Sequence, residues 1–424
     1  MGARMNKEKH FPDIKPIDFV PAFSGLVGKA ALTASFALVW AKELGIQNES
    51  FVFENVRLEL LVGSLLTLLF SLVWPTAAPA GTLAPFLILV PFMVACGAHP
   101  LVFGVLVGVL GLVFVRTGLF QKVSGLSSPY VRTCLTLSFG LSGSALALGN
   151  LFRFFEKILW AAALLLLLLG GLFFILRKRK KTWLMIPLSA AASLGIPMLF
   201  GIFPAVSSKV SPIRIDPSWW WNEMWGIGFG LSMKTLLVTL PFALFAVFLW
   251  TIDAAAVETI REAQESTKKV GKIDSSLSFY AAAIRNLAGS ILGGAQTASI
   301  WRSFLIPLYM VNRPMRVCAV LLGTFGVAAA VTAIPVQLMS YVPLVWSVLL
   351  FGIFMPFLVV SLSNLLRMKN GKKSLPAILF SLAGAMWSPI LTWLLSGFFE
   401  RLFFSQKPGS LSPPQSPDPF QTPV

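Results

Sequence analysis

Charged residues are scarce in this sequence. Asp, Glu, Lys and Arg make up 12% of its 424 residues, about half the roughly 25% that is usual in soluble domains. Hydrophobic residues make up 56%, and the mean hydropathy is +0.80. This composition excludes the soluble globular class and indicates a membrane protein.

Histidine and cysteine are also rare, with two and three copies respectively. Cys96, Cys134 and Cys318 lie in or beside apolar segments, and they form neither a CxxC pair nor a cluster with histidines. A zinc site is therefore not expected. We interpret the three cysteines as packing residues, and we predict neither a metal nor a cofactor.

Motifs for catalysis are lacking as well. The run Gly140-Leu141-Ser142-Gly143 resembles the nucleophile segment of an intramembrane serine protease, but such a serine needs a histidine base. The two histidines, His10 and His99, both lie upstream of it. Gly28-Lys29 lacks the first glycine and the Ser/Thr of a phosphate-binding loop, and no HExxH occurs. We predict that the chain is not an enzyme.

Long apolar blocks, in contrast, are abundant. Most are about 17 to 25 residues long, enough to cross a hydrocarbon core of about 30 Å as a helix. We predict an all-α polytopic membrane protein with about 14 transmembrane segments, the last two being short for separate crossings. The predicted spans are 20–40, 57–74, 80–96, 100–116, 130–149, 157–176, 183–205, 235–258, 279–293, 297–311, 315–334, 343–364, 375–386 and 389–404.

A polar, tryptophan-rich stretch divides these spans into two sets of seven. The composition changes predict a cytoplasmic N-terminal segment (1–19), a first seven-span repeat (20–205), a Trp-rich outer connector (206–233), a second seven-span repeat (234–404) and a tail (405–424). The tail is rich in Pro and Ser and has no apolar run, so we expect it to be disordered.

The net charge of +17 comes mostly from loops beside apolar spans, such as Arg177–Lys181. Basic residues there set topology and attract anionic lipid, so membrane lipid is an expected partner and nucleic acid is not. With both termini cytoplasmic, the basic loops all fall inside, as the positive-inside rule requires. Trp219, Trp220, Trp221 and Trp225 then fall at the outer interface, where we predict an interfacial helix.

One apolar segment in each half is interrupted by helix breakers. Pro75, Pro79, Gly81 and Pro85 interrupt the third span, and Gly293-Gly294 opens the tenth. A matched pair of broken spans points to a transporter site, because half-helix N-termini can then face a substrate across a polar cavity. The alternative is that these residues only kink ordinary membrane helices.

At these positions the sequence resembles the seven-plus-seven inverted-repeat transporters, a superfamily that includes uracil and xanthine permeases, sulfate permeases and bicarbonate exchangers. The resemblance covers residues 20–404 and is nearest an uncharacterised bacterial branch. It rests on Ala80-Gly81-Thr82 in the third span, on Leu240-Pro241 followed by Asp253 in the eighth, and on Gly293-Gly294 with Arg302-Ser303 in the tenth. It implies a core bundle of spans 1–4 and 8–11, a gate bundle of spans 5–7 and 12–14, and broken third and tenth spans that line the site. The site residues expected from the two breaks are Gly81, Thr82, Thr297, Ala298 and Ser303.

Three charged residues inside spans are further site candidates. Arg302 follows the tenth-span break, where a guanidinium could capture an oxyanion with two hydrogen bonds; snorkelling to an interface is the alternative. Asp253 is an intramembrane carboxylate and a candidate coupling group, or else a helix-end acid that pairs with the charged run after it. Lys29, in the first span, could add positive charge to the site, pair with a carboxylate elsewhere, or snorkel.

The function expected from these features is alternating-access transport of a small anion, such as sulfate, a carboxylate or bicarbonate, coupled to H+ or Na+. No acid lies between Gly293 and Met310, whereas the resemblance implies a glutamate there for nucleobase permeases. A proton-coupled nucleobase permease is nevertheless the alternative, and a non-transporting sensor or scaffold is a third reading. We expect a multi-pass protein of the bacterial inner membrane; a homodimer is left open.

Overall fold

The computed structural model describes residues 13–119, 129–204, 206, 211–263, 270, 273–300, 302–366 and 371–387, together with Thr392, Leu395, Phe398 and Glu400. For 129, 253–263, 302 and 371–373 it describes the backbone alone. Most of the predicted last span, 389–404, and the tail, 405–424, lie outside the described residues.

The described chain is helical. Its first half comprises α1 (Phe19–Leu44), α2 (Phe51–Val73), the 3-10 helix η2 (Ala84–Leu89) continued by α3 (Val90–Ala95), α4 (Pro100–Arg116), α6 (Pro129–Phe154), α7 (Leu159–Lys178) and α8 (Met185–Leu199). The second half comprises α10 (Met233–Ala263), α11 (Ser275–Ile291), α12 (Arg302–Val311), α13 (Met315–Thr332), α14 (Ile334–Met339), α15 (Val342–Leu349), the π-helix η6 (Leu350–Phe354), α16 (Met355–Leu366) and α17 (Gly371–Met386). Short helices are η1 (Pro16–Asp18), η3 (Glu156–Ile158), η4 (Thr182–Leu184), α9 (Pro217–Trp219) and the π-helix η5 (Trp220–Met224).

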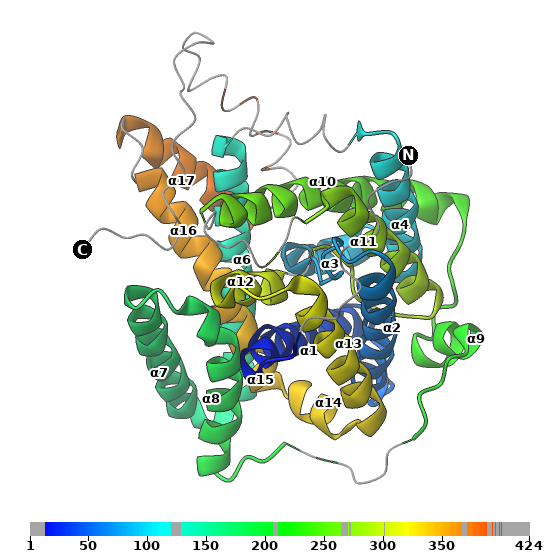
Figure 1. Ribbon diagram of the computed structural model, residues 1–424, viewed down its shortest axis with the longest axis horizontal. Coiled ribbons are helices and arrows are strands. Elements are labelled where there is room, and N and C mark those ends of the chain that lie inside the picture. Colours follow the sequence, from blue (N-terminus) through cyan, green and yellow to red (C-terminus); the bar gives the residue numbers. More distant parts are fainter. Residues whose placement is uncertain are drawn as a thin grey trace.

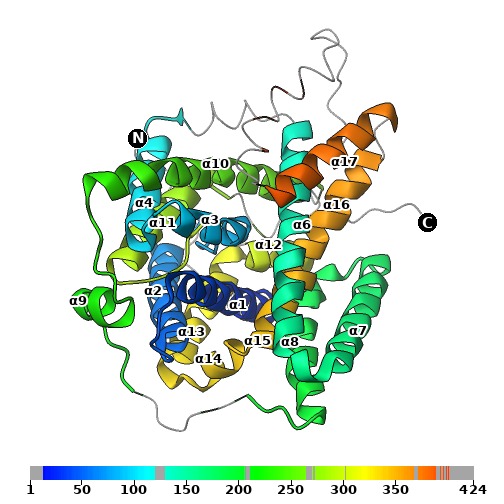
Figure 2. The same cartoon turned by 180° about the vertical axis from the view of Figure 1, so that it is seen from behind.

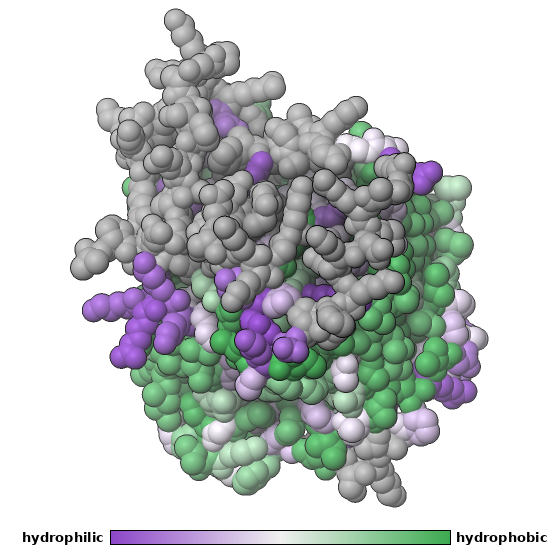
Figure 3. Space-filling view, in the orientation of Figure 1, coloured by the Kyte–Doolittle hydropathy of each residue, from purple (hydrophilic) through white to green (hydrophobic). Residues whose placement is uncertain are grey.

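These helices form an all-α multi-pass membrane protein. Among the described residues, eight helices are long and apolar enough to cross a membrane, and the apolar helices 84–95, 100–116 and 374–386 are shorter. Apolar residues cover broad areas of the molecular surface in Figure 3. On α7, for example, Leu164, Leu167, Leu168, Phe174 and Ile175 are exposed, as expected for a lipid-facing helix.

The helices gather into two groups (Figures 1 and 2). Helices α1–α4 and α10–α14 lie together on one side, and α6–α8 with α15–α17 lie on the other. Each group draws on both halves of the sequence, so neither half folds as a separate block. The first group is called the core bundle below, and the second the gate bundle.

Glycines bring the helices of the core bundle together in two equivalent pairs. Gly104 and Gly108 on α4 face α11 so closely that a Cβ would collide with Ser290 or Leu287, and a Cβ on Gly111 would collide with Trp250 of α10. Gly323 and Gly326 on α13 face Leu68 and Ser64 on α2 in the same way. Small residues allow such close backbone approach in membrane proteins. In both pairs the fourth helix of one half of the sequence packs on the second helix of the other half: α4 packs on α11, and α13 packs on α2.

The GLSG run lies in the gate bundle and has a packing role there. A Cβ at Gly140 would lie 2.7 Å from the Leu358 backbone N, and one at Gly143 would collide with the Phe354 ring. The Ser142 hydroxyl donates a hydrogen bond to the Ala385 carbonyl at 2.9 Å. The run therefore joins α6 to α16 and α17.

Two of the four tryptophans of the connector are buried. Trp220 and Trp225 are buried in the protein, at 0% and 2% exposure. The Trp225 ring packs edge-on against Phe51, at a centroid distance of 4.7 Å, and its Nε1 donates to the Gly293 carbonyl at 2.7 Å. These two rings are therefore packed inside the protein, against α1, α2 and the tenth-span break.

The three cysteines differ in burial. Cys134 and Cys318 are buried, as predicted for packing residues, whereas Cys96 is exposed at the end of α3.

Candidate functional site

The two broken spans meet at the centre of the core bundle. Ala80 and Ile300 form an antiparallel bridge. The Gly81 N–H donates to the Ser299 carbonyl at 2.7 Å, the Ser299 N–H donates back to the Gly81 carbonyl at 3.3 Å, and the Leu83 N–H donates to the Thr297 carbonyl at 2.7 Å. The extended backbone before one half-helix is therefore hydrogen-bonded to the extended backbone before the other.

A half-helix begins at each end of this short ladder. Helix Ala84–Ala95 starts directly after Leu83, and α12 starts at Arg302, two residues after Ile300. Helix N-termini carry partial positive charge and unpaired N–H groups, so they favour anions. The antiparallel arrangement points the two half-helices in opposite directions away from one shared region.

Two buried asparagines hold the tenth-span segment in its extended form. Asn55 on α2 donates to the Gly293 carbonyl at 2.9 Å and accepts from the Ala295 N–H at 3.1 Å. Asn286 on α11 accepts from the Ala298 N–H at 2.8 Å and donates to the Ala298 carbonyl at 3.2 Å. Backbone groups outside a helix need such partners when water is absent, and both asparagines are fully buried.

Gln296 connects the segment to three other elements. Its Oε1 accepts hydrogen bonds from the hydroxyls of Thr33 on α1 at 2.8 Å and Thr82 in the third-span break at 2.5 Å. Its Nε2 and its backbone N–H donate to the Glu59 carboxylate on α2 at 3.1 and 3.2 Å. The Gln296 side chain therefore links the break in the tenth span to the break in the third span by a hydrogen bond.

Behind Gln296 lies a cluster of buried charges. Glu59 on α2 pairs with Arg285 on α11, and Lys29 on α1 lies within the electrostatic reach of both. All three side chains are at most 1% exposed. The cluster holds two basic side chains and one carboxylate, next to the two breaks.

The predicted site residues are found at the following places. Gly81, Thr82, Thr297 and Ala298 come together in the ladder, and Ser303 lies against Gly28, where a Cβ would be 2.8 Å from the serine Oγ. Lys29 is buried in the charge cluster. Arg302 is the first residue of α12 and Asp253 lies in the last third of α10, but both side chains lie outside the described residues.

Glu59, Arg285, Gln296, Asn55 and Asn286 were not predicted. The signal in the sequence was the charge of Arg285 inside the predicted span 279–293, since intramembrane charges are costly and rarely incidental.

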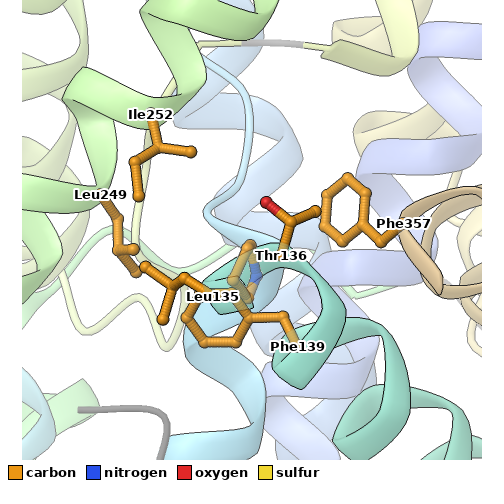
Figure 4. A pocket seen from close by; sticks show the side chains of 7 residues that line it. Leu135, Thr136, Phe139, Leu249, Ile252 and Phe357 are labelled. Carbon is orange, nitrogen blue, oxygen red and sulfur yellow. The ribbon is translucent and has the colours of Figure 1, made fainter. Parts of the chain in front are cut away.

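A small pocket lies beside the start of the first half-helix, between the core and gate bundles (Figure 4). Pro85 and the α10 residues Leu249 and Ile252 line it from the core, and Leu135, Thr136, Phe139 and Phe357 line it from the gate. Its volume is about 10 Å³, which is room for about one water molecule. Among the described residues that line it, Thr136 is the one with a polar side chain.

A larger cleft of about 330 Å³ separates the bundles further along the same boundary. Core helices α1 and α3 line it with Lys42, Glu43 and Pro91, and gate helices α6 and α15 line it with Asn150, Arg153 and Trp346. The small pocket and the larger cleft both lie along α6, and the pocket beside the half-helix has the smaller volume.

This all-α membrane fold, in which two broken spans cross at the centre, is also found among solved structures. Three solved structures share it: one described as the overall structure of SLC26A9, the murine Slc26a9 anion transporter in the inward-facing state, and the transmembrane domain of a cyanobacterium bicarbonate transporter, BicA. Their TM-scores are 0.60, 0.58 and 0.58, each at 12% sequence identity. The matches cover 91%, 93% and 90% of this chain, and 64%, 69% and 98% of the respective relatives. This chain thus spans less than two thirds of the first structure.

The predicted resemblance is confirmed at the level of the fold. By sequence, the chain belongs to the family described as "Protein of unknown function (DUF3360)", whose model matches residues 13–402. No curated protein matches the sequence.

Proposed function

We propose that this protein is a secondary active transporter of a small anion. The observation that carries the proposal is the hydrogen-bonded crossing of the two broken spans, which brings two half-helix N-termini to one region next to a buried cluster of two basic side chains and one carboxylate. The structural relatives support it, since two of them are named as anion or bicarbonate transporters.

In this proposal the anion binds in the pocket at Pro85, between the core and gate bundles. Thr82 and Thr297 lie in the ladder beside it, and Ser303 follows Arg302 at the start of α12. Arg302 would supply a bidentate guanidinium contact to an oxyanion. The pocket has room for one water, so binding requires the two bundles to separate there.

Transport would follow from movement of the core bundle against the gate bundle. The cleft that Lys42 and Arg153 line would give access from the outer side, and opening of the pocket side would give access from the inner side. Inverted-repeat transporters alternate access in this way around a fixed site. Coupling to H+ or Na+ completes the proposal, with Asp253 as the candidate from the sequence.

We further propose fourteen segments, both termini in the cytoplasm and residence in a bacterial inner membrane. Contacts between chain segments agree with this order of crossings. Arg313, after α12, pairs with Asp18 before α1, and the Asp274 N–H before α11 donates to the Thr76 carbonyl after α2 at 2.9 Å. Cysteines introduced at the exposed positions Lys178 and Asn222 should be labelled by impermeant reagents from opposite sides of the membrane. Labelling from one side would refute the order of spans.

A ligand-stabilisation screen tests the choice of an anion over a nucleobase. The purified protein would be heated with chloride, sulfate, bicarbonate, small carboxylates, uracil or xanthine. A ligand at 100 times its Kd stabilises the folded state by about 2.7 kcal/mol. Stabilisation by an anion, weakened in Arg302→Gln, supports the proposal. Stabilisation by a nucleobase alone would replace it with the permease alternative, and stabilisation by no solute would favour a sensor or scaffold.

A further inference from the structure

The extended segment of the tenth-span break begins at a tight turn after α11. The N–H groups of residues 292–294 fold back and donate to carbonyls of the last helical turn, 288–290. Gly293 has a left-handed φ of +92° in this turn, which glycine adopts without strain. The carbonyls of Ile291 and Gly293 come after those acceptors. Carbonyls at the end of a helix have no donor within it, so these two need donors from elsewhere in the protein.

Indole N–H groups of the connector are the donors. The Trp221 Nε1 donates to the Ile291 carbonyl at 2.9 Å, and the Trp225 Nε1 donates to the Gly293 carbonyl at 2.7 Å. Buried backbone groups require partners of this kind. The two bonds differ in place, because Ile291 is the last residue of α11 whereas Gly293 lies in the turn that leads into the extended segment.

Packing fixes the Trp225 ring on its other sides. The ring lies edge-on to Phe51 of α2 and to Trp40 of α1, at centroid distances of 4.7 and 6.4 Å. Trp220, which is also buried, covers the turn itself, since a Cβ on Gly293 would lie 2.5 Å from the Trp220 Cβ. The connector therefore packs directly on the turn, and Trp225 joins that turn to the outer ends of α1 and α2.

The Gly293 carbonyl lies close along the chain to the proposed anion site. It also accepts from the Asn55 amide, whose oxygen accepts from the Ala295 N–H. Gln296 and Thr297, which come next, belong to the crossing of the two breaks. An extended segment has no helical hydrogen bonds of its own, so its position inside a membrane protein depends on such outside partners.

We propose that Trp225 is a positioning residue of the anion site. Its indole N–H and the Asn55 amide together fix the Gly293 carbonyl, and this holds the extended segment where Thr297 enters the ladder. Trp225 acts through Gly293 and does not itself contact the anion. The inference rests on the proposed function and extends the site to the connector, which lies outside both seven-span repeats of the sequence.

Trp225→Phe tests this role, because phenylalanine keeps an aromatic ring in the same packing but has no N–H. The matched control is Trp221→Phe, which removes the same kind of bond from the end of α11. Hydrogen–deuterium exchange of the full chain in lipid nanodiscs measures how readily the backbone amides of 294–300 open. Their exchange should be about two- to tenfold faster in Trp225→Phe, the worth of one hydrogen bond, and unchanged in Trp221→Phe.

Uptake of radiolabelled chloride and sulfate into proteoliposomes is the second measurement. A segment that is less often in place lowers apparent affinity by the same fraction, so the KM of Trp225→Phe should rise about two- to tenfold while the maximum rate stays within about twofold. Trp221→Phe should keep the wild-type KM. A merely structural role for Trp225 would lower the melting temperature and leave KM unchanged.

A second form of the Trp225 variant keeps the size of the indole. Benzothienylalanine, introduced at position 225 by stop-codon suppression, has sulfur in place of the N–H and should behave like Trp225→Phe even if the smaller ring impairs folding. Wild-type exchange of 294–300 in the benzothienyl protein, or faster exchange with an unchanged KM, would overturn the inference. Equal rises of KM in the variants of Trp225 and Trp221 would also overturn it. A wild type that moves neither probe, nor any anion found in the stabilisation screen, would instead refute the proposed function, whatever the exchange rates.

Discussion

Glu59 and Arg285 form an ion pair that joins the two halves of the chain at the centre of the core bundle. One side chain comes from the second helix of the first half, and the other comes from the corresponding helix of the second half. Glu59 extends this link to the tenth-span segment through Gln296. The pair therefore holds the crossing of the broken spans in register, although neither residue belongs to the breaks.

Removing one partner of this pair should be strongly destabilising. Glu59→Gln leaves the Arg285 guanidinium buried beside Lys29 without its carboxylate, and breaking a buried pair typically costs about 3–5 kcal/mol. The double variant Glu59→Gln/Arg285→Met removes the orphaned charge and should recover much of the loss. Thermal unfolding in detergent measures both. A single variant as stable as the wild type would contradict the role given to the pair.

Gly294 lies against the Glu59 carboxylate. A Cβ there would collide with the carboxylate, whose Cδ would lie 2.6 Å away. Gly294→Ala should destabilise by about 1–3 kcal/mol, as overpacking does, and should reduce anion uptake because the tenth-span segment must shift. Gly195→Ala in α8 is the matched control, since a Cβ there meets no atom within 4 Å. Equal behaviour of the two variants would show that the segment adapts freely.

Movement between the bundles can be tested by a disulfide across their boundary. Thr136 on α6 and Ile252 on α10 line the same pocket from opposite bundles. In a background without the three native cysteines, Thr136→Cys/Ile252→Cys should stop uptake when oxidised and restore it on reduction, while each single variant remains active. Undiminished uptake by the fully cross-linked protein would contradict relative movement at this pocket.

His99 should make the folding stability of the protein depend on pH. It lies in the turn between α3 and α4, against Gly230 of the connector, and its burial lowers its pKa below the usual value near 6.5. The unfolded chain then binds a proton that the folded chain resists, so stability should fall as the pH drops from about 7 through 6. Thermal unfolding of His99→Gln should show a smaller loss over this range. An identical pH profile for both proteins would exclude His99 as the cause.

The sequence was most informative about the spans and least informative about what surrounds the breaks. Apolar runs predicted helices such as 100–116 and 315–334, which match α4 and α13 within two residues. The matched breaks predicted the crossing at Gly81 and Thr297, because Pro and Gly interrupt helices regardless of tertiary context.

The polar groups around that crossing could not be predicted in the same way. Glu59 lies close to the start of a predicted span, where a carboxylate normally meets water, and Asn55 and Asn286 carry no charge that marks them as intramembrane residues. Burial of Trp225 was missed because an indole suits an interface and a protein interior equally well. Whether an indole lies at an interface or in the protein interior depends on long-range packing, and a hydropathy pattern carries no information on such packing.

The most direct test of the central claim is uptake of labelled anions by the reconstituted protein, compared with Arg302→Gln. We expect saturable uptake of chloride, bicarbonate or sulfate, inhibited by the other anions and not by uracil. Loss of a charge-assisted bidentate contact should weaken apparent anion affinity about ten- to a hundredfold in the variant. Saturable uptake of uracil without anion uptake, or anion uptake with unchanged affinity in Arg302→Gln, would contradict the account.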